Sequence, residues 1–114
     1  MTEKPITFRH RYDKLKLDEF TTIRGAAQFK RLKIGQVVNV ETPDGIFCAK
    51  ITNLQLKTTA EMEFDFLDAD TSYPGFRINS RQDFVKLLNS FRAPAWKQVT
   101  MDEPLTIISL SKKF

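Results

Sequence analysis

A chain of 114 residues, 41% of them hydrophobic, is long enough to form one domain with its own buried core. Its single cysteine, Cys48, excludes an internal disulfide and a cysteine-based metal site. Its single histidine, His10, likewise excludes a histidine-based metal site and a Ser-His-Asp triad. We therefore expect no metal and no cofactor, and we interpret Cys48 as a small buried residue of a strand.

The formal net charge of +4 is unevenly distributed along the chain. Residues 1–40 carry nine Lys or Arg against four Asp or Glu, residues 41–76 carry two against seven, and residues 77–114 carry seven against three. This pattern is compatible with separate basic and acidic faces. A basic face attracts nucleic acids, because phosphate neutralisation dominates their affinity. A mixed, solvated surface is the alternative interpretation.

No part of the sequence indicates a membrane or an export signal. The first twenty residues are charged and lack the apolar run of a signal peptide. No stretch approaches the roughly 20 apolar residues that cross a bilayer. The expected location is therefore the cytoplasm.

Residues 6–12 alternate between apolar and polar side chains, which predicts a first strand. Arg9 and Arg11 lie two residues apart and would share one face of this strand. A polar connection with room for one helical turn follows over residues 13–18.

Residues 20–24 are predicted to form a second strand that ends at Gly25. Thr22 and Arg24 are expected on the same face, because side chains two residues apart on a strand point the same way. A short helical turn or a loop follows over residues 26–31.

The clearest local signal is a β-hairpin. Residues 34–42 are rich in β-branched valine, and residues 46–56 return with apolar–polar alternation. The turn between them is Pro43-Asp44-Gly45, in which proline presets φ and glycine tolerates a left-handed backbone.

The last part of the chain is predicted to contain two helices and a strand. Thr58-Thr59 can cap a helix over residues 60–69, and Ser80 can cap a helix over residues 81–91. The second helix carries an apolar stripe at helical spacing that is expected to face the core, formed by Phe84, Leu87, Leu88 and Phe91. Residues 105–110 are the last strand.

This order predicts an α+β fold, a small mixed β-barrel with two or three short helices, built as a single domain over residues 1–114. The last strand is expected to pair among the first ones, because closure removes exposed strand edges. The helix over residues 81–91 should then pack on the outside of the barrel.

Five motifs follow one another along the chain in a specific order. They are Thr22-Ile23-Arg24, Leu32-Lys33-Ile34-Gly35-Gln36 before a Val-rich strand, Gly75-Phe76, Ser80-Arg81-Gln82-Asp83-Phe84, and Leu105-Thr106-Ile107-Ile108. Their order and spacing resemble those of an ASCH domain, a member of the PUA-like superfamily, over nearly the whole chain. The resemblance implies a PUA-like β-barrel with a ligand cleft beside the Thr-Ile-Arg strand.

The motifs Ile6-Thr7-Phe8 and Gly45-Ile46-Phe47-Cys48 are similar to those of small bacterial amidohydrolases that deacetylate acetylcytidine. The resemblance implies a catalytic Lys, Thr and Glu. The Thr falls on Thr22, whereas the Lys position holds Glu19 and the Glu position falls near Pro74. A rearranged pair of Thr22 and Glu19 is the remaining catalytic candidate, so we expect no efficient hydrolysis.

Several residues keep two interpretations at this stage. Arg24 is either a ligand contact or an ion-pair partner of Asp18 or Glu19. Trp96 and Tyr73 are either stacking platforms for nucleobases or packing residues of the core or a lid.

The leading interpretation is a module that binds RNA or a nucleotide in a basic cleft near the Thr-Ile-Arg strand. The expected contact residues are Arg9, Arg11, Thr22, Arg24, Lys30, Arg31 and Lys33. The basic residues 30–33 also have a simpler interpretation as a solubilising loop. Two alternatives remain: a small amidohydrolase acting on acetylated cytidine or a related modified nucleoside, and a regulatory protein that binds another protein. The sequence leaves the oligomeric state open.

Overall fold

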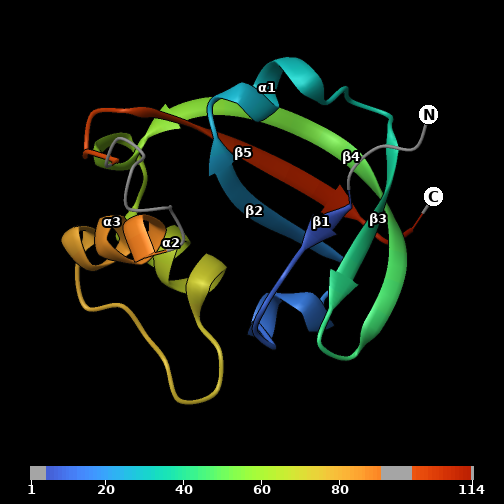
Figure 1. The fold of residues 1–114 in the computed structure, drawn as a ribbon, viewed down its shortest axis with the longest axis horizontal. Helices are drawn as coiled ribbons and strands as arrows, with labels where there is room; N and C mark the ends of the chain where they lie inside the picture. The colour runs from blue at the N-terminus through green and yellow to red at the C-terminus, as the bar shows by residue number, and fades with distance from the viewer. Residues whose placement is uncertain (1–4, 91–98, 114) are drawn as a thin grey trace.

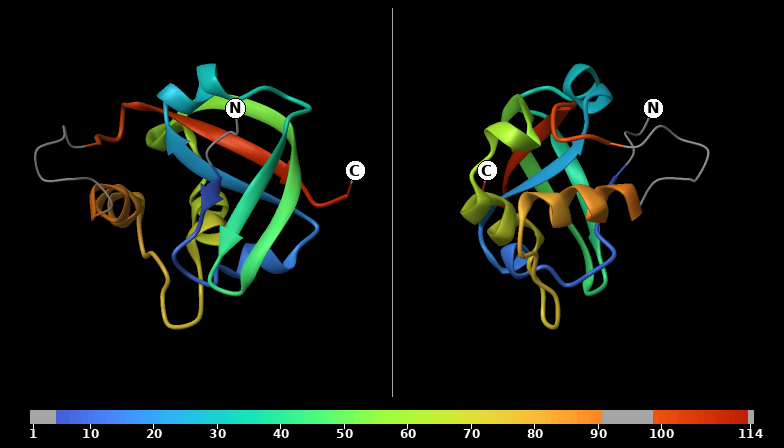
Figure 2. Two further views of the ribbon diagram at one scale, coloured as in Figure 1. Left: turned by 45° about the vertical axis from the view of Figure 1, so that its right-hand side comes forward. Right: turned by 90° about the vertical axis from the view of Figure 1, so that its left-hand side faces the viewer.

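The computed structural model describes residues 5–90 and 99–113 of the chain. Within these residues a five-stranded sheet curls into a half-barrel, with short helices at its side and rim (Figures 1 and 2). The strands are β1 (Ile6–Thr7), β2 (Glu19–Gly25), β3 (Val37–Thr42), β4 (Gly45–Thr58) and β5 (Pro104–Ser111). The helices are α1 (Ala27–Arg31), α2 (Phe64–Thr71) and α3 (Arg81–Ser90), and two 3₁₀ turns are η1 (Asp13–Lys16) and η2 (Thr59–Glu61). The predicted α+β class is confirmed.

The strand order in the sheet is β1-β3-β4-β5-β2. The β1–β3 pair is parallel, and the other three pairs are antiparallel. The last strand therefore pairs with both the long hairpin strand β4 and the early strand β2, as the sequence predicted. Among the described strands β1 and β2 are not paired with each other, so the sheet is a half-barrel with two edges.

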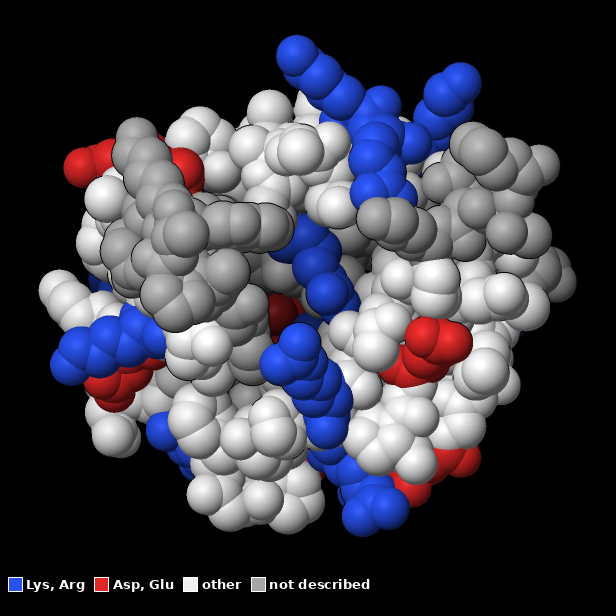
Figure 3. All heavy atoms as spheres, viewed as in Figure 1, with Lys and Arg blue, Asp and Glu red and all other residues white. Residues whose placement is uncertain are grey.

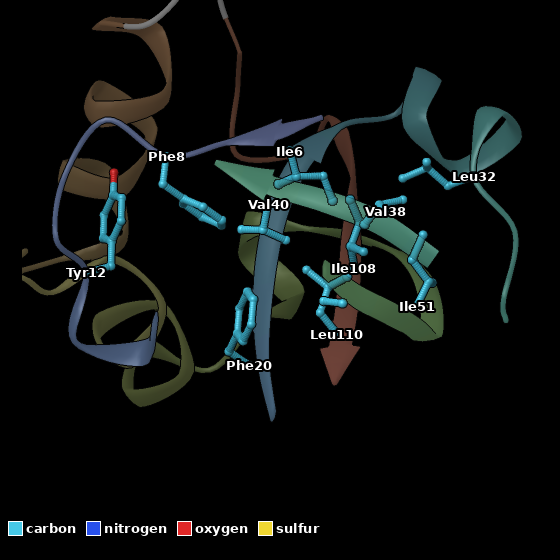
Figure 4. Close-up of a cluster of buried hydrophobic side chains, with 11 residues drawn as sticks. Ile6, Phe8, Tyr12, Phe20, Leu32, Val38, Val40, Ile51, Ile108 and Leu110 are labelled. Carbon is cyan, nitrogen blue, oxygen red and sulfur yellow. The ribbon is translucent and has the colours of Figure 1, made fainter. Parts of the chain in front are cut away.

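The two faces of the sheet bury two separate hydrophobic clusters. The cluster inside the curl draws on all five strands (Figure 4), and the cluster on the outer face includes Phe84 of α3. Strand β5 supplies both clusters, because Ile108 and Leu110 point inward whereas Leu105 and Ile107 point outward. The helix predicted over residues 81–91 thus packs outside, as expected, and its predicted end with Phe91 lies outside the described residues.

Two predicted helix caps form, with different outcomes. The Ser80 Oγ accepts a hydrogen bond from the Asp83 amide at 3.2 Å, which confirms Ser80 as the N-cap of α3. Thr58 caps only the 3₁₀ turn η2, through reciprocal hydrogen bonds with Glu61. The single helix predicted over residues 60–69 is therefore replaced by this turn and the separate helix α2.

The first strand is shorter than predicted. Pairing with β3 ends where the Phe8 amide donates to the Glu41 carbonyl at 2.8 Å. Beyond Phe8 the chain leaves the sheet and enters η1, so Arg9 and Arg11 lie on a connection and not on a strand. The predicted hairpin needs a smaller correction, because β3 begins at Val37 and not at residue 34.

The prediction that Cys48 is buried is wrong. Cys48 is exposed, and its thiol donates a hydrogen bond to Asn39 Oδ1 on the neighbouring strand at 3.3 Å. The reason is the face that it occupies: Cys48 shares one face of β4 with Ile46, which is 67% exposed, and with the exposed Lys50. The buried residues of β4 are their neighbours on the other face.

A matched pair of substitutions on β4 tests this assignment of faces. Ile51 is fully buried and Ile46 is 67% exposed. Ile51→Ala should lower the free energy of unfolding by about 2–5 kcal/mol, because it leaves a cavity. Ile46→Ala should change it by about 0.5 kcal/mol or less. Chemical denaturation measures both values, and equal losses would contradict the described sheet.

Candidate functional site

A pocket of about 740 Å³ opens beside the edge strand β2, within the size range of small-molecule sites. Its walls come from the β1–η1 connection, β2, the start of α1, and the helices α2 and α3. Figure 3 shows a hollow in this face, with basic side chains at its rim and an acidic side chain deep inside. The charged and hydroxyl-bearing residues of this β2 pocket are Thr7, Arg9, Tyr12, Lys14, Thr22, Arg24, Asp70 and Thr71.

Arg24 is held in place by its neighbours in the pocket. Thr22 and Arg24 point from the same face of β2, and the Arg24 Nε donates a hydrogen bond to Thr22 Oγ1 at 3.3 Å. The Arg24 Nη2 donates to the Thr7 carbonyl at 3.0 Å, and its guanidinium lies 5.2 Å from the centre of the Phe8 ring. Burial lowers the pKa of Arg24, whereas Tyr12 raises it, and the group remains a cation.

The alternative ion-pair partners predicted for Arg24 lie elsewhere. The carboxylate of Asp18 pairs with the Lys113 ammonium at 3.1 Å. Glu19 is exposed and lies three residues from Thr22, which places it on the opposite face of β2. The rearranged pair of Thr22 and Glu19 is therefore not assembled.

A buried ion pair lies in the same pocket. The Lys14 Nζ of η1 is 3.1 Å from Asp70 Oδ1 of α2, and the two side chains are only 7% and 5% exposed. The Thr21 hydroxyl donates to the same Asp70 oxygen at 2.7 Å. Burial lowers the pKa of Lys14, and Asp70 opposes this effect by stabilising the ammonium. Lys14 is therefore an amine that releases its proton more readily than an exposed lysine.

Aromatic rings support the wall next to this pair. The Lys14 Nζ lies 5.1 Å from the Phe8 ring centre and 5.3 Å from the Tyr12 ring centre. Burial raises the pKa of the Tyr12 phenol, so it stays neutral and can donate a hydrogen bond. The His10 ring stacks on Tyr73 at 4.4 Å, which makes both of them packing residues behind this wall.

The predicted contact residues divide into two groups. Arg9, Thr22 and Arg24 line the β2 pocket. Arg11 lies at the β3–β4 turn, where it pairs with Asp44 at 2.8 Å. The residues predicted to form a basic loop are exposed on or just after α1 and are not among the pocket lining, namely Lys30, Arg31 and Lys33. Trp96 lies outside the described residues.

Sequence reasoning missed two central residues, Lys14 and Asp70. Each belongs to a short element whose position is set by tertiary packing, so no local spacing connects them. The sequence contained only an indirect indication that these two residues are buried in the pocket: both are charged residues on segments that also carry apolar core residues. Pro74, which falls near the family's Glu position, is exposed and is not among the residues lining the β2 pocket.

Fold and pocket together define a small α+β protein with a cationic pocket at the edge of a curled sheet. The chain belongs to the same family as the uncharacterized protein MJ0364 of Methanocaldococcus jannaschii, to which it is 42% identical over 88 residues, or 75% of this chain and 77% of that protein. No protein-family model matches the chain, and no solved structure matches it at a significant level.

The described residues lack two further features. None of the helices in residues 5–90 and 99–113 is long and apolar enough to cross a membrane. In the same part of the chain, no group of three or more His, Cys, Asp or Glu side chains is arranged to hold a metal ion.

The ionisation of Lys14 can be measured directly. We expect its Cε resonance, assigned by its loss in Lys14→Met, to titrate below the ordinary lysine pKa of about 10.4. Asp70→Asn should move the midpoint further down, because it removes the carboxylate that stabilises the ammonium. A midpoint that rises in Asp70→Asn would contradict the described pair.

The same shift has a consequence for stability. The folded protein releases the Lys14 proton at a lower pH than the unfolded chain does. The free energy of unfolding should therefore gain a contribution that rises with pH between the lowered pKa and the ordinary one. This contribution should be missing in Lys14→Met, which serves as the control.

Proposed function

We propose that the β2 pocket binds a nucleotide, either free or as one residue of an RNA chain. The observation that carries this proposal is the charge of the described lining, which contains three cations, Arg9, Lys14 and Arg24, and one carboxylate, Asp70. A partly buried pocket with net positive charge favours an anionic ligand. Apolar lining from α3 and β5 supplies the remaining surface for a base.

Arg24 is the group best placed to bind phosphate. A guanidinium has five N–H donors in a rigid plane. Within residues 5–90 and 99–113, two of them have partners, at Thr22 and at the Thr7 carbonyl. These two contacts fix the orientation of the group, so a bidentate contact with phosphate would cost little side-chain entropy.

We propose further that the fold is that of an ASCH domain of the PUA-like superfamily. The order of the five motifs supports this assignment, as does a sheet in which the last strand returns between β4 and β2. A pocket lined by Thr22, Ile23 and Arg24 also supports the proposal, because the resemblance implies a ligand cleft beside this strand.

Substitution of Arg24 tests the binding function. Arg24→Gln should weaken nucleotide or RNA binding by about tenfold or more, because hydrogen bonds to charged groups contribute roughly 1.5–3 kcal/mol. The matched control is Arg77→Gln, since Arg77 is exposed, pairs with Asp68 and is not among the pocket lining. Fluorescence polarisation at several salt concentrations measures both, and thermal unfolding checks that Arg24→Gln is folded.

Equal losses in the two variants would mean nonspecific attraction and would remove the pocket from the proposal. If Arg24→Gln does not fold, the exposed rim residue Arg9 provides the second variant, Arg9→Gln. It should also weaken binding and reduce the dependence on salt.

A second candidate function is amide hydrolysis of an acetylated cytidine or a related modified nucleoside. It is favoured by one observation: Lys14, Asp70 and Thr22 line the same pocket. The expectation of no efficient hydrolysis rested on Glu19 at the family's Lys position and on Pro74 near its Glu position, whereas Lys14 and Asp70 bring an amine and a carboxylate to the pocket from other elements. In this function, water and the amide give cytidine and acetate. A neutral Lys14 accepts a proton from the attacking water, Arg24 stabilises the oxyanion that develops on the acetyl carbonyl, and the Lys14 ammonium then returns the proton to the departing amine of cytidine.

An assay with acetylcytidine tests the second function. Turnover should fall by about 10²–10⁴-fold in Lys14→Met, as expected for the loss of a general base. Thr22→Ala should also lose activity, whereas Lys50→Met, a substitution of an exposed lysine outside the pocket lining, should keep it. Absence of turnover in the wild type, or turnover that survives Lys14→Met, would remove this function and leave the binding function standing.

A further inference from the structure

We infer that the ligand is a single-stranded polynucleotide, and that a second groove on the other side of Tyr12 holds the nucleotide next to the one in the β2 pocket. The inference rests on the proposed binding function and specifies its substrate class. The Tyr12 groove, as we call it, has a volume of about 350 Å³. It lies between η1, the β3–β4 turn and the first residues of β4.

The two hollows are adjacent, because Tyr12 lines both of them. Tyr12 is 9% exposed and is braced by edge-to-face contacts with Phe8 at 5.7 Å and Tyr73 at 5.4 Å. It therefore forms a rigid partition between the hollows. A ligand that fills both must pass over this partition, which suits a flexible chain of linked units.

The chemistry of the Tyr12 groove repeats that of the pocket. Its charged lining consists of three cations and one carboxylate: Arg11, Lys16, Lys112 and Asp44. Its apolar lining includes Phe47 and Ile46, the latter 67% exposed. A cationic rim around an exposed apolar floor suits a unit with one anionic and one flat apolar part, which is the chemistry of a nucleotide.

The cations of the groove are positioned for exchange with a phosphate. Arg11 and Asp44 form an ion pair whose side chains are 69% and 68% exposed, and such exposed pairs contribute little to stability. Arg11 can therefore leave Asp44 for a phosphate at small cost. Lys112 lies 4.8 Å from the Phe47 ring centre and donates to the Leu15 carbonyl, which fixes its ammonium beside the apolar floor.

Several basic side chains of this face are arranged in a row. In Figure 3 they follow one line, from the region of α1, past the hollow, towards the β3–β4 turn. The β2 pocket and the Tyr12 groove are neighbours, because Tyr12 lines both of them. A duplex keeps its bases stacked and paired, so it cannot place bases in two hollows. A single strand with unstacked bases can do so.

Three probes distinguish this inference from binding of a free nucleotide: uridine monophosphate, a short oligouridylate and an RNA duplex of the same length. Uridine is chosen because its oligomers have little structure of their own. The oligouridylate should bind about tenfold or more tighter than the monophosphate, since it fills both hollows. It should also bind more tightly than the duplex.

The variant Lys16→Gln tests the groove itself. It should weaken oligouridylate binding and reduce the slope of log affinity against log salt by about 0.7, the value for one phosphate contact of a single strand. Its affinity for uridine monophosphate should be unchanged. The matched control, Lys50→Gln, changes an exposed lysine that lines neither hollow and should leave both affinities unchanged.

Three other outcomes would overturn the inference, and they differ in whether the function of the β2 pocket survives. Equal affinity for the monophosphate and the oligouridylate, with both reduced in Arg24→Gln, would refute the groove and leave the pocket function intact. Equal affinity for duplex and single strand would also refute the groove. Absence of binding by all three probes would overturn the binding function and this inference together.

Discussion

The antiparallel pairing of β2 with β5 is the constraint on which the functional face depends. It joins Thr22 to Ile108 and Arg24 to Thr106, so it connects the two ends of the chain and must overcome the entropy of closing a long loop. This entropic cost is offset by the hydrophobic burial of β5, whose side chains are buried on both faces of the sheet. The register is strict, because a shift by one residue would exchange the side chains of the two hydrophobic clusters. The same register fixes which face of β2 carries Thr22 and Arg24.

The buried pair of Lys14 and Asp70 is held in place by the sheet that the β2–β5 pairing creates. A contribution to the stability of the fold is a poor explanation for its presence. Removing two charges from water costs about as much as their attraction returns, so apolar side chains of similar volume would serve the fold equally well. The pair nevertheless occupies the wall of the β2 pocket, with the Thr21 hydroxyl on the same carboxylate. Strongly desolvated, mutually dependent charges in a cleft are typical of functional sites. We therefore interpret the pair as a feature of the pocket that the fold tolerates.

The sequence predicted what local rules decide. The alternation of side chains placed Thr22 and Arg24 on one face, and the cap at Ser80 and the hairpin turn follow from the chemistry of single residues. The predictions from the sequence were wrong or incomplete where tertiary contacts determine the structure. The first strand ends early because pairing with β3 ends near Glu41, although the alternation continues. Cys48 lies on the outer face of β4, which the alternation alone could not distinguish from the inner one. Lys14 and Asp70 meet only because η1 and α2 pack on the same edge of the sheet.

The two candidate functions require different protonation states of Lys14, and this limits what a single pocket can do at one pH. Binding of an anion gains from the ammonium, whereas general-base chemistry needs the neutral amine. Burial moves Lys14 towards the neutral form, and Asp70 moves it back towards the ammonium. A bound phosphate would add to the effect of Asp70 and would further suppress the neutral amine. An uncharged nucleoside would leave the proportion of neutral Lys14 unchanged by this effect. Phosphorylated ligands should therefore be bound without reaction, and any chemistry in this pocket should be confined to ligands without a phosphate near Lys14.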